Sequence, residues 1–239
     1  LHLPDQLLEA LRLAIKKEDV DRAIVGQQLA DLGLDRPIVD DDVVDLTNLQ
    51  RQVIHTTDRV GAPKSASAEA AIADLNPEVK VHVHEARLAA GNALDLIRPV
   101  DLVIDGSDNF ATRFAVNAAC VQQHTPLVSG AAIRMEGQLA VFDSRRADSP
   151  CYRCLYREGE EPDQTCTDNG VLAPVVGVIG SLQALEAIKV LLNLGETLCG
   201  RLLLFDALYS EWRSLILRKD PACPVCGAHT TLAAGAHDN

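Results

Sequence analysis

Two CxxC pairs far apart in the sequence restrict the folds open to this chain more than any other feature. CYRC occupies residues 151–154 and CPVC occupies residues 223–226. Zinc prefers four thiolates in a tetrahedron, and each CxxC lets one turn supply two of them. One shared ion would hold the end of the chain against a much earlier segment. The alternatives are two unrelated surface pairs or redox dithiols. We expect a closed, structural Zn²⁺ site formed by Cys151, Cys154, Cys223 and Cys226.

The bulk composition limits the compartment and the class of partner. The chain has seven cysteines, an odd number, and its first residues lack the basic start and cleavage-like end of a secretion signal. These features favour metal ligation over disulfides, and the cytoplasm is the expected location. The formal charge of −12 argues against nucleic acid as the main partner, since that binding uses clustered lysines and arginines. It leaves ATP open, because its phosphates need only a few local cations.

Short apolar segments that end in polar residues alternate with helical patterns through the middle of the chain. Residues 100–109 (VDLVIDGSDN) read as a buried strand, residues 109–124 as a helix and residues 125–133 as the next strand. A further helix is expected over residues 63–76, where Asn-Pro supplies a stop. Such alternation is typical of an α/β fold with a mainly parallel sheet.

Two later segments indicate strands of another kind. Residues 137–143 (GQLAVFD) and 200–219 (GRLLLFDALYSEWRSLILRK) resemble an antiparallel extension. We therefore predict one α/β domain over residues 1–239. It would contain a Rossmann-like, mainly parallel sheet flanked by helices, an antiparallel extension and the four-cysteine zinc knuckle.

The most apolar long stretch, residues 170–195, raises the question of a membrane span. Polar residues and a proline interrupt it, at Pro174, Gln183, Glu186 and Lys189. A spanning helix needs about 20 consecutive, predominantly apolar residues. We therefore expect a strand or turn that leads into a core helix, and no membrane association.

Residues 22–42 (RAIVGQQLADLGLDRPIVDDD) have the order of a nucleotide-binding βαβ unit: strand, helix, strand and then acid. Such units carry a glycine-rich first turn, because glycine lets the backbone close on phosphate. Here the turn offers Gly26 followed by two glutamines, and eleven residues separate Gly26 from Ile38. Residues 1–37 are therefore atypical for a nucleotide site.

Polar residues beyond this unit suggest nucleotide contacts. An acid after a strand suits ribose hydroxyls, and Arg51, a few residues later, suits phosphate. Lys64 could hold the β- and γ-phosphates, and Asp108 could hold Mg²⁺. The alternatives are helix caps or solvated loop for the acids, and a surface lysine at a helix start for Lys64.

Seven segments carry a family resemblance. They are LTNLQRQ, GAPKSASA, DGSDNFATR, PLVSGAAIRMEGQ, CYRC, GVLAPVVGVIGSLQALEAIKVL and CPVCG. Their identity and order over roughly residues 38–227 resemble the HesA/MoeB/ThiF branch of the ubiquitin-activating-enzyme superfamily. The likeness is strongest to the MoeB type, the molybdopterin-synthase adenylyltransferases.

The resemblance implies an activity and a set of site residues. Such proteins use ATP and Mg²⁺ to adenylate the C-terminal Gly-Gly carboxylate of a small ubiquitin-like sulfur carrier, and they act as homodimers. It implies that Asp40 meets the ribose, that Asn48 and Arg51 meet phosphates, and that Lys64 supports the leaving pyrophosphate. It also implies Asp108 as the Mg²⁺ ligand. The remaining nucleotide-binding residues implied are Thr47 and Asn109.

Cys166 matches a cysteine that some relatives use for thioester, persulfide or disulfide chemistry. Its surroundings oppose such a role, because Glu160, Glu161 and Asp163 would raise the pKa of its thiol. Adenylation of this type does not require the cysteine. A catalytic role and an inert surface position both stay open for Cys166.

Two departures from the family keep three functions in view. The glycine-rich turn is missing, and so is an upstream arginine that relatives direct to the partner subunit's ATP. Either segments are absent from this sequence, or the nucleotide site is rebuilt or degenerate. The leading hypothesis is an adenylyltransferase for a carrier of the molybdopterin-synthase small-subunit type. The alternatives are a non-catalytic carrier-binding module with a degenerate ATP site and a thiamine-pathway adenylyltransferase.

Overall fold

A computed structural model describes residues 36–157, 159 and 170–227. The chain divides into two compact units, one up to Arg87 and the other from Leu88 onward. The glycine-poor turn at Gly26 and the strand predicted before it lie outside the described residues.

In the first unit, two short parallel strands are joined through a helix. β1 (Arg36–Val39) pairs with β2 (Val81–His84), with Val39 opposite His84. The connection contains the 3₁₀ turns η1 (Leu46–Asn48) and η2 (Thr57–Arg59) and the helix α3 (Lys64–Leu75). α3 confirms the helix predicted over residues 63–76 and packs against β2. This strand–helix–strand order is the crossover that parallel strands require.

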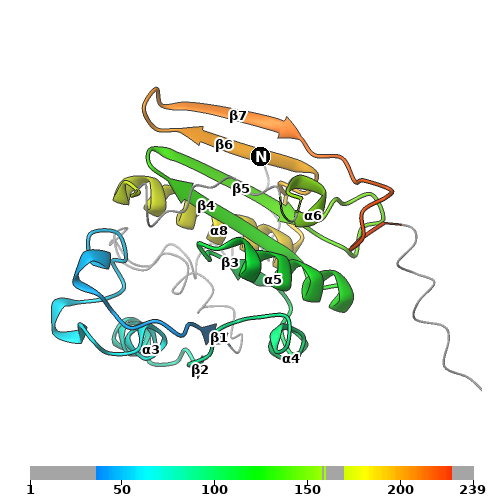
Figure 1. Ribbon diagram of the computed structural model, residues 1–239. Helices are drawn as coiled ribbons and strands as arrows, with labels where there is room; N and C mark the ends of the chain where they lie inside the picture. Colours follow the sequence, from blue (N-terminus) through cyan, green and yellow to red (C-terminus); the bar gives the residue numbers. More distant parts are fainter. Residues whose placement is uncertain (1–35, 158, 160–169, 228–239) are drawn as a thin grey trace, which may run out of the picture. The chain divides into compact units, whose positions relative to one another are not determined.

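In the second unit, five strands form one sheet in the order β3-β4-β5-β6-β7 (Figure 1). The strands are β3 (Val103–Asp105), β4 (Leu127–Ile133), β5 (Glu136–Phe142), β6 (Arg201–Asp206) and β7 (Glu211–Ile216). β3 and β4 are parallel, whereas the three pairings from β4 to β7 are antiparallel. The predicted antiparallel extension is therefore confirmed.

Helices cover both faces of this sheet. They are α4 (Ala93–Ile97), α5 (Phe110–Gln123), α6 (Tyr152–Leu155) and α8 (Ala173–Leu192). Ala140 and Phe142 of β5 share a buried cluster with residues of α4, α5 and α6. A Cβ at Gly137 would instead meet Ile179 of α8. Since alternate strand residues point to opposite faces, α8 covers the face that α5 leaves open.

The α/β class is confirmed. The described strands form two sheets, the parallel pair β1–β2 and a mixed sheet of five strands. In the mixed sheet only β3–β4 is parallel, so two of the five described strand pairings are parallel. α8 is long and apolar enough to cross a membrane by length and composition alone. In the structure it packs against β4 and β5, and its polar residues Gln183 and Glu186 are buried. These contacts are those of the predicted core helix.

Candidate functional site

The carboxyl end of β1 carries a carboxylate held in place by the backbone. Asp40 N donates a hydrogen bond to His84 O (3.2 Å), which continues the pairing with β2. Asp40 Oδ1 accepts a hydrogen bond from Asp42 N (2.8 Å). Burial is the main cause that raises the pKa of the half-buried Asp40 carboxyl. An acid held at a strand end is the arrangement that the sequence predicted for a ribose contact.

Lys64 is the first residue of α3, and it is buried with only 9% of its surface exposed. Its Nζ lies 2.6 Å from Asp42 Oδ2, and its backbone N donates to Asp42 O (2.9 Å). A lysine that is buried in this way seldom occurs without a partner. The alternative of a solvated surface lysine is therefore wrong for Lys64.

The predicted phosphate contacts Asn48 and Arg51 lie in and just after η1, together with Thr47, a further predicted nucleotide-binding residue. Asp45 caps this turn, because its Oδ1 accepts hydrogen bonds from Thr47 N (2.8 Å) and Thr47 Oγ1 (2.5 Å). Arg51 Nη1 donates to Thr47 O (3.3 Å), and Arg51 N donates to Asn48 O (3.0 Å). The Thr47 hydroxyl thus donates its hydrogen bond to the Asp45 cap of the turn, whereas the half-exposed Arg51 has further N–H donors for a ligand.

The other predicted nucleotide residues belong to the second unit. Asp108 is exposed and follows β3, and Asn109 caps α5 by accepting a hydrogen bond from Thr112 N (2.9 Å). Mg²⁺ is commonly held by one or two carboxylates and keeps several waters. An exposed carboxylate at the end of a parallel strand fits that requirement.

Arg113 is a residue of this region that sequence reasoning missed. It is 7% exposed, and its Nε donates to Ser107 O (3.0 Å), as does its Nη2. Its Nη1 lies 3.5 Å from the Tyr152 hydroxyl. Burial opposes the charge, but Tyr152 and Asp105 outweigh it and raise the pKa of Arg113. The position of Arg113 at the end of DGSDNFATR could have suggested it.

Asp105 was also missed, and one of its oxygens is uncommitted. Its Oδ1 accepts a hydrogen bond from Ser107 N (2.9 Å). Its Oδ2 is buried with no hydrogen-bond partner among the described residues, and the same holds for Ser107 Oγ. Buried polar groups are normally paired. The loop after β3 therefore holds unused oxygens beside the segment that carries Asp108.

The two CxxC pairs meet as the sequence predicted. The Sγ atoms of Cys151, Cys154, Cys223 and Cys226 all lie within 4.8 Å of one another. Cys151 Sγ is 3.7 Å from Cys223 Sγ, and Cys154 Sγ is 3.4 Å from Cys226 Sγ. A tetrahedron with Zn–S bonds of about 2.3 Å has S–S edges of about 3.8 Å. The four thiols therefore fit Zn²⁺, and their separations exclude disulfides, which need about 2.05 Å.

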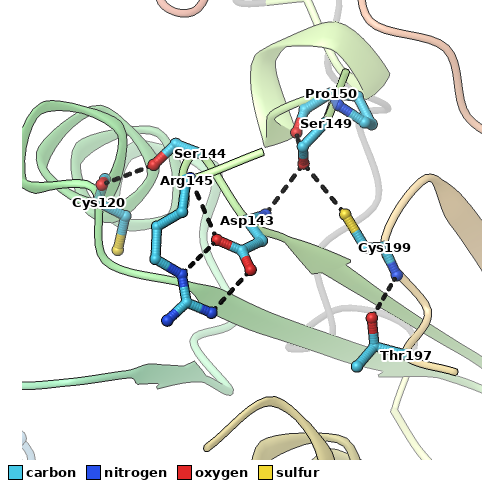
Figure 2. A network of polar contacts seen from close by, with 8 residues as sticks. All are labelled: Cys120, Asp143, Ser144, Arg145, Ser149, Pro150, Thr197 and Cys199. Atoms are coloured by element: carbon cyan, nitrogen blue, oxygen red, sulfur yellow. Dashed lines mark hydrogen bonds and ion pairs between the residues drawn. The ribbon is translucent and has the colours of Figure 1, made fainter. Parts of the chain in front are cut away.

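A polar network fixes the segment between β5 and the first cysteine pair (Figure 2). Arg145 binds the Asp143 carboxylate through Nε and Nη2, both at 2.8 Å. Asp143 N donates to Ser149 Oγ (3.0 Å), which donates to Pro150 O (2.9 Å). Cys199 Sγ lies 3.4 Å from the same Ser149 oxygen. The network therefore holds the chain immediately before Cys151.

Further cysteine and histidine residues lie outside the four-cysteine cluster. Cys120 is buried in α5. His82 and His84 both lie exposed on one face of β2. Cys166 lies outside the described residues, so its catalytic role stays a prediction.

Relatives with assigned names match most of this chain. A Thermus thermophilus sulfur carrier protein adenylyltransferase is 45% identical over 213 residues, 87% of this chain and 79% of that protein. A Salmonella typhimurium molybdopterin-synthase adenylyltransferase is 45% identical over 202 residues, 84% of this chain and 81% of that protein. An Anopheles gambiae adenylyltransferase and sulfurtransferase is 47% identical over 208 residues. That match covers 85% of this chain, which spans about half of the insect protein (47%).

Solved structures agree on the fold. A crystal structure of Escherichia coli MccB with MccA-N7isoASN superimposes with a TM-score of 0.74 at 22% identity, over 85% of this chain and 63% of that one. The ThiF family model matches residues 24–225. This range includes Asp40, Lys64, Asp108 and three of the four cluster cysteines, all but Cys226. The resemblance seen in the sequence is confirmed: this chain belongs to the ThiF family.

Proposed function

We propose that this protein is an adenylyltransferase that uses ATP to activate the C-terminal Gly-Gly carboxylate of a ubiquitin-like sulfur carrier. The observation that carries the proposal is the pair of held charges after β1. Asp40 is suited to a ribose, and the buried Lys64 is suited to phosphates. The names of relatives about 45% identical to this chain support the same reaction. We further propose that both units together form one adenylylating domain, which acts as a cytoplasmic homodimer.

The reaction needs charge neutralisation more than acid–base chemistry. A carboxylate oxygen of the carrier attacks the α-phosphorus, the new O–P bond forms, and the bond to pyrophosphate breaks. No general base is required, because a C-terminal carboxylate is ionised at neutral pH. Arg51 and Lys64 would offset the charge that develops on the phosphates. Mg²⁺ bound at Asp108 would supply further charge compensation when present.

The zinc cluster serves structure in this proposal. Four cysteines fill a tetrahedral site and leave no open position for a substrate. Zn²⁺ would join the segment after β5 to the segment after β7, and thereby fix the outer part of the sheet.

An apolar strip on β6 and β7 supports a protein as the partner. Phe205 and Trp212 stack with ring centroids 4.3 Å apart. Trp212 and Ile216 are 45% and 78% exposed on β7, which is an edge strand among the strands that the structure describes. Exposed aromatic residues and open strand edges are typical of surfaces that bind another chain. We propose that the folded body of the carrier docks on this strip.

The choice of carrier divides the proposal into two forms. Relatives about equally similar to this chain have different names. Beside the molybdopterin-synthase adenylyltransferase, an Escherichia coli sulfur carrier protein ThiS adenylyltransferase is 45% identical over 190 residues, 80% of this chain and 75% of that protein. We propose a carrier of the molybdopterin-synthase small-subunit type, with a thiamine-pathway carrier as the second candidate. A non-catalytic docking module is the remaining alternative. The ion pair that holds Lys64 argues against it, because a protein that does not bind ATP has no need of a positioned cation there.

ATP–pyrophosphate exchange tests the function directly. The protein is assayed with Mg²⁺ and ATP, without a carrier and with carriers of the two types. Exchange that depends on one carrier is the expected result, and Lys64→Met should lower it on the order of 10²-fold. Carrier binding without exchange would overturn the enzymatic proposal and leave a docking protein.

A further inference from the structure

We propose that Asp42 is a positioning residue that holds Lys64 Nζ in the place where it meets the phosphates of ATP. The inference rests on the proposed function, and it concerns a residue to which no role has been assigned. Asp42 lies in the sequence between Asp40, the expected ribose contact, and η1, the 3₁₀ turn that precedes Arg51.

Two contacts join Asp42 to Lys64. The side chains form an ion pair with Nζ and Oδ2 2.6 Å apart, and the backbone of Lys64 donates to Asp42 O (2.9 Å). The hydrogen bond between Lys64 N and Asp42 O fixes the backbone position of Asp42 relative to Lys64. Because the Asp42 side chain is short, its carboxylate then has little freedom to move. The long Lys64 side chain therefore has one defined end point.

The backbone around this pair is braced by further hydrogen bonds. Val44 N donates to Ala62 O (2.8 Å), and Gly61 N donates to Val44 O (2.8 Å). Val43 and Pro63 form an antiparallel bridge between these bonds and the ion pair. The segment after β1 is thus bound to the segment that begins α3, and the ion pair lies at the end of this short ladder.

Asp42 also connects the two expected ATP contacts. Its backbone N donates to Asp40 Oδ1 (2.8 Å), while its carboxylate binds Lys64. Asp42 therefore fixes the Asp40 carboxylate, which is expected to contact the ribose, relative to the Lys64 ammonium group, which is expected to contact the phosphates. Misplacing a catalytic group by about 1 Å can cost on the order of 10²-fold in rate.

The exposure of the two side chains indicates how a ligand would reach the lysine. The Lys64 side chain is 11% exposed, whereas that of Asp42 is 67% exposed. An ammonium group has three donors, and the ion pair occupies only one of them. Asp42 thus holds Lys64 on one side and leaves donors for phosphate oxygens.

Asp41 supplies a matched control. It is the neighbouring residue, it is exposed, and the structure gives it no hydrogen bond or ion pair with the other described residues. Asp41→Asn removes the same charge from the same loop as Asp42→Asn. Any general effect of net charge or of loop polarity should appear in both variants.

The test is a double-mutant cycle in the carrier-dependent exchange assay. Asp42→Asn should lower kcat on the order of 10-fold while the KM for ATP changes less than about threefold. Asp41→Asn should match the wild type. Because Asp42 acts through Lys64, the variant Asp42→Asn/Lys64→Met should be no slower than Lys64→Met. A fall in KM with kcat unchanged would show Asp42 to be a competitor of ATP and would overturn the proposal, as would additive losses.

A second measurement separates this proposal from the adenylation reaction itself. Acetylation of Lys64 by an N-hydroxysuccinimide ester is followed by peptide mass spectrometry, without a carrier. Asp42→Asn should be labelled at Lys64 several-fold faster than the wild type, and Asp41→Asn should not. Equal rates in all three proteins would overturn the positioning role, whether or not the chain catalyses exchange. If Asp42→Asn is labelled faster but the wild type shows no ATP–pyrophosphate exchange, the adenylation proposal is overturned and the positioning role of Asp42 stands.

Discussion

At the scale of single residues, burial distinguishes charged side chains that are fixed by protein contacts from those that stay solvated. Lys64 and Arg113 are both buried, and each is bound by oxygen atoms at defined distances. Asp108 is exposed, and Arg51 is half-exposed. Desolvating a charge without partners costs several kcal/mol, so buried cations require the contacts that they make here. Their substitutions should therefore have effects that surface charges do not.

Arg113→Lys should lower the free energy of unfolding by about 1–3 kcal/mol. Lysine keeps the charge but cannot reproduce the forked contact with Ser107 O or reach Tyr152 at the same time. Urea unfolding measures the difference. Arg146→Lys is the control, because Arg146 is exposed and its pair with Asp148 is long (3.5 Å). Equal midpoints for both variants would contradict the structural role of Arg113.

Alkaline pH should weaken the fold through Cys120. Burial raises the pKa of this thiol to about 12, whereas an unfolded thiol has a pKa of about 8.5. The unfolded state therefore loses its proton first. The contribution of the protonated Cys120 thiol to the free energy of unfolding is fully present below pH about 8.5 and is lost as the pH rises toward about 12.

The loss attributable to Cys120 should reach about 2 kcal/mol by pH 10. Urea unfolding of the wild type and Cys120→Ala at pH 8, 9 and 10 in reducing buffer measures it. The variant should lose less stability than the wild type over this range. Parallel pH curves for the two proteins would show that Cys120 is not the source.

At the scale of elements, the contact between β4 and α8 depends on the absence of a side chain. A Cβ at Gly130 would lie 2.4 Å from Gln183 Cδ. Gln183 Nε2 in turn donates to Asp105 O (2.9 Å) and Val128 O (3.3 Å), which tie the helix to two strands. The close approach of helix and sheet therefore positions the end of β3, where the loop with Asp108 begins.

Gly130→Ala should destabilise the protein by about 1–3 kcal/mol, because the added methyl group displaces Gln183 or the helix. Gly177→Ala is the control within α8, since a Cβ there meets nothing within 4 Å. It should stabilise the helix by up to about 1 kcal/mol. Thermal melts of both variants separate the two effects. A stable Gly130→Ala protein would mean that Gln183 can move aside without loss.

At the scale of the whole molecule, metal binding should join distant segments of the chain. Purified protein should contain one Zn²⁺ per chain, and a chelator that removes it should lower the melting temperature, because binding free energy becomes folding free energy. Cys226→Ser should lose the metal. Cys199→Ser should keep it, because Cys199 contacts Ser149 outside the cluster. Metal content by mass spectrometry decides, and a metal-free native protein would contradict the zinc assignment.

The apolar strip makes a second prediction at this scale. Trp212→Ser should weaken carrier binding on the order of 10-fold or more, as for a buried aromatic anchor. ATP binding should stay unchanged. Arg213→Ser is the control, because adjacent strand residues point to opposite faces. Calorimetric titration with the carrier measures both, and equal affinities would place the docking surface elsewhere.

Much of the fold could be predicted because it follows from local patterns. The helical pattern of residues 109–124 predicted α5, and the segment 63–76 with its Asn-Pro stop predicted α3. The apolar segment 125–133 predicted β4. Strand direction was less accessible. The pairing of β4 with β5 is antiparallel because Ile133 and Glu136 face each other across a short turn, whereas β3 and β4 are connected through α5. Connection length thus governed direction.

The sequence by itself determined several helices and strands, the four cysteines that cluster and the residue types of the proposed nucleotide site, since spacing and order encode them. Only the tertiary structure decided which charges are held. Asp42 and Lys64 are 22 residues apart, and Arg113 and Tyr152 are 39 apart. Their contacts depend on how α3 begins against the end of β1 and how α5 packs on α6. Such pairings arise from packing between elements, which no local pattern specifies.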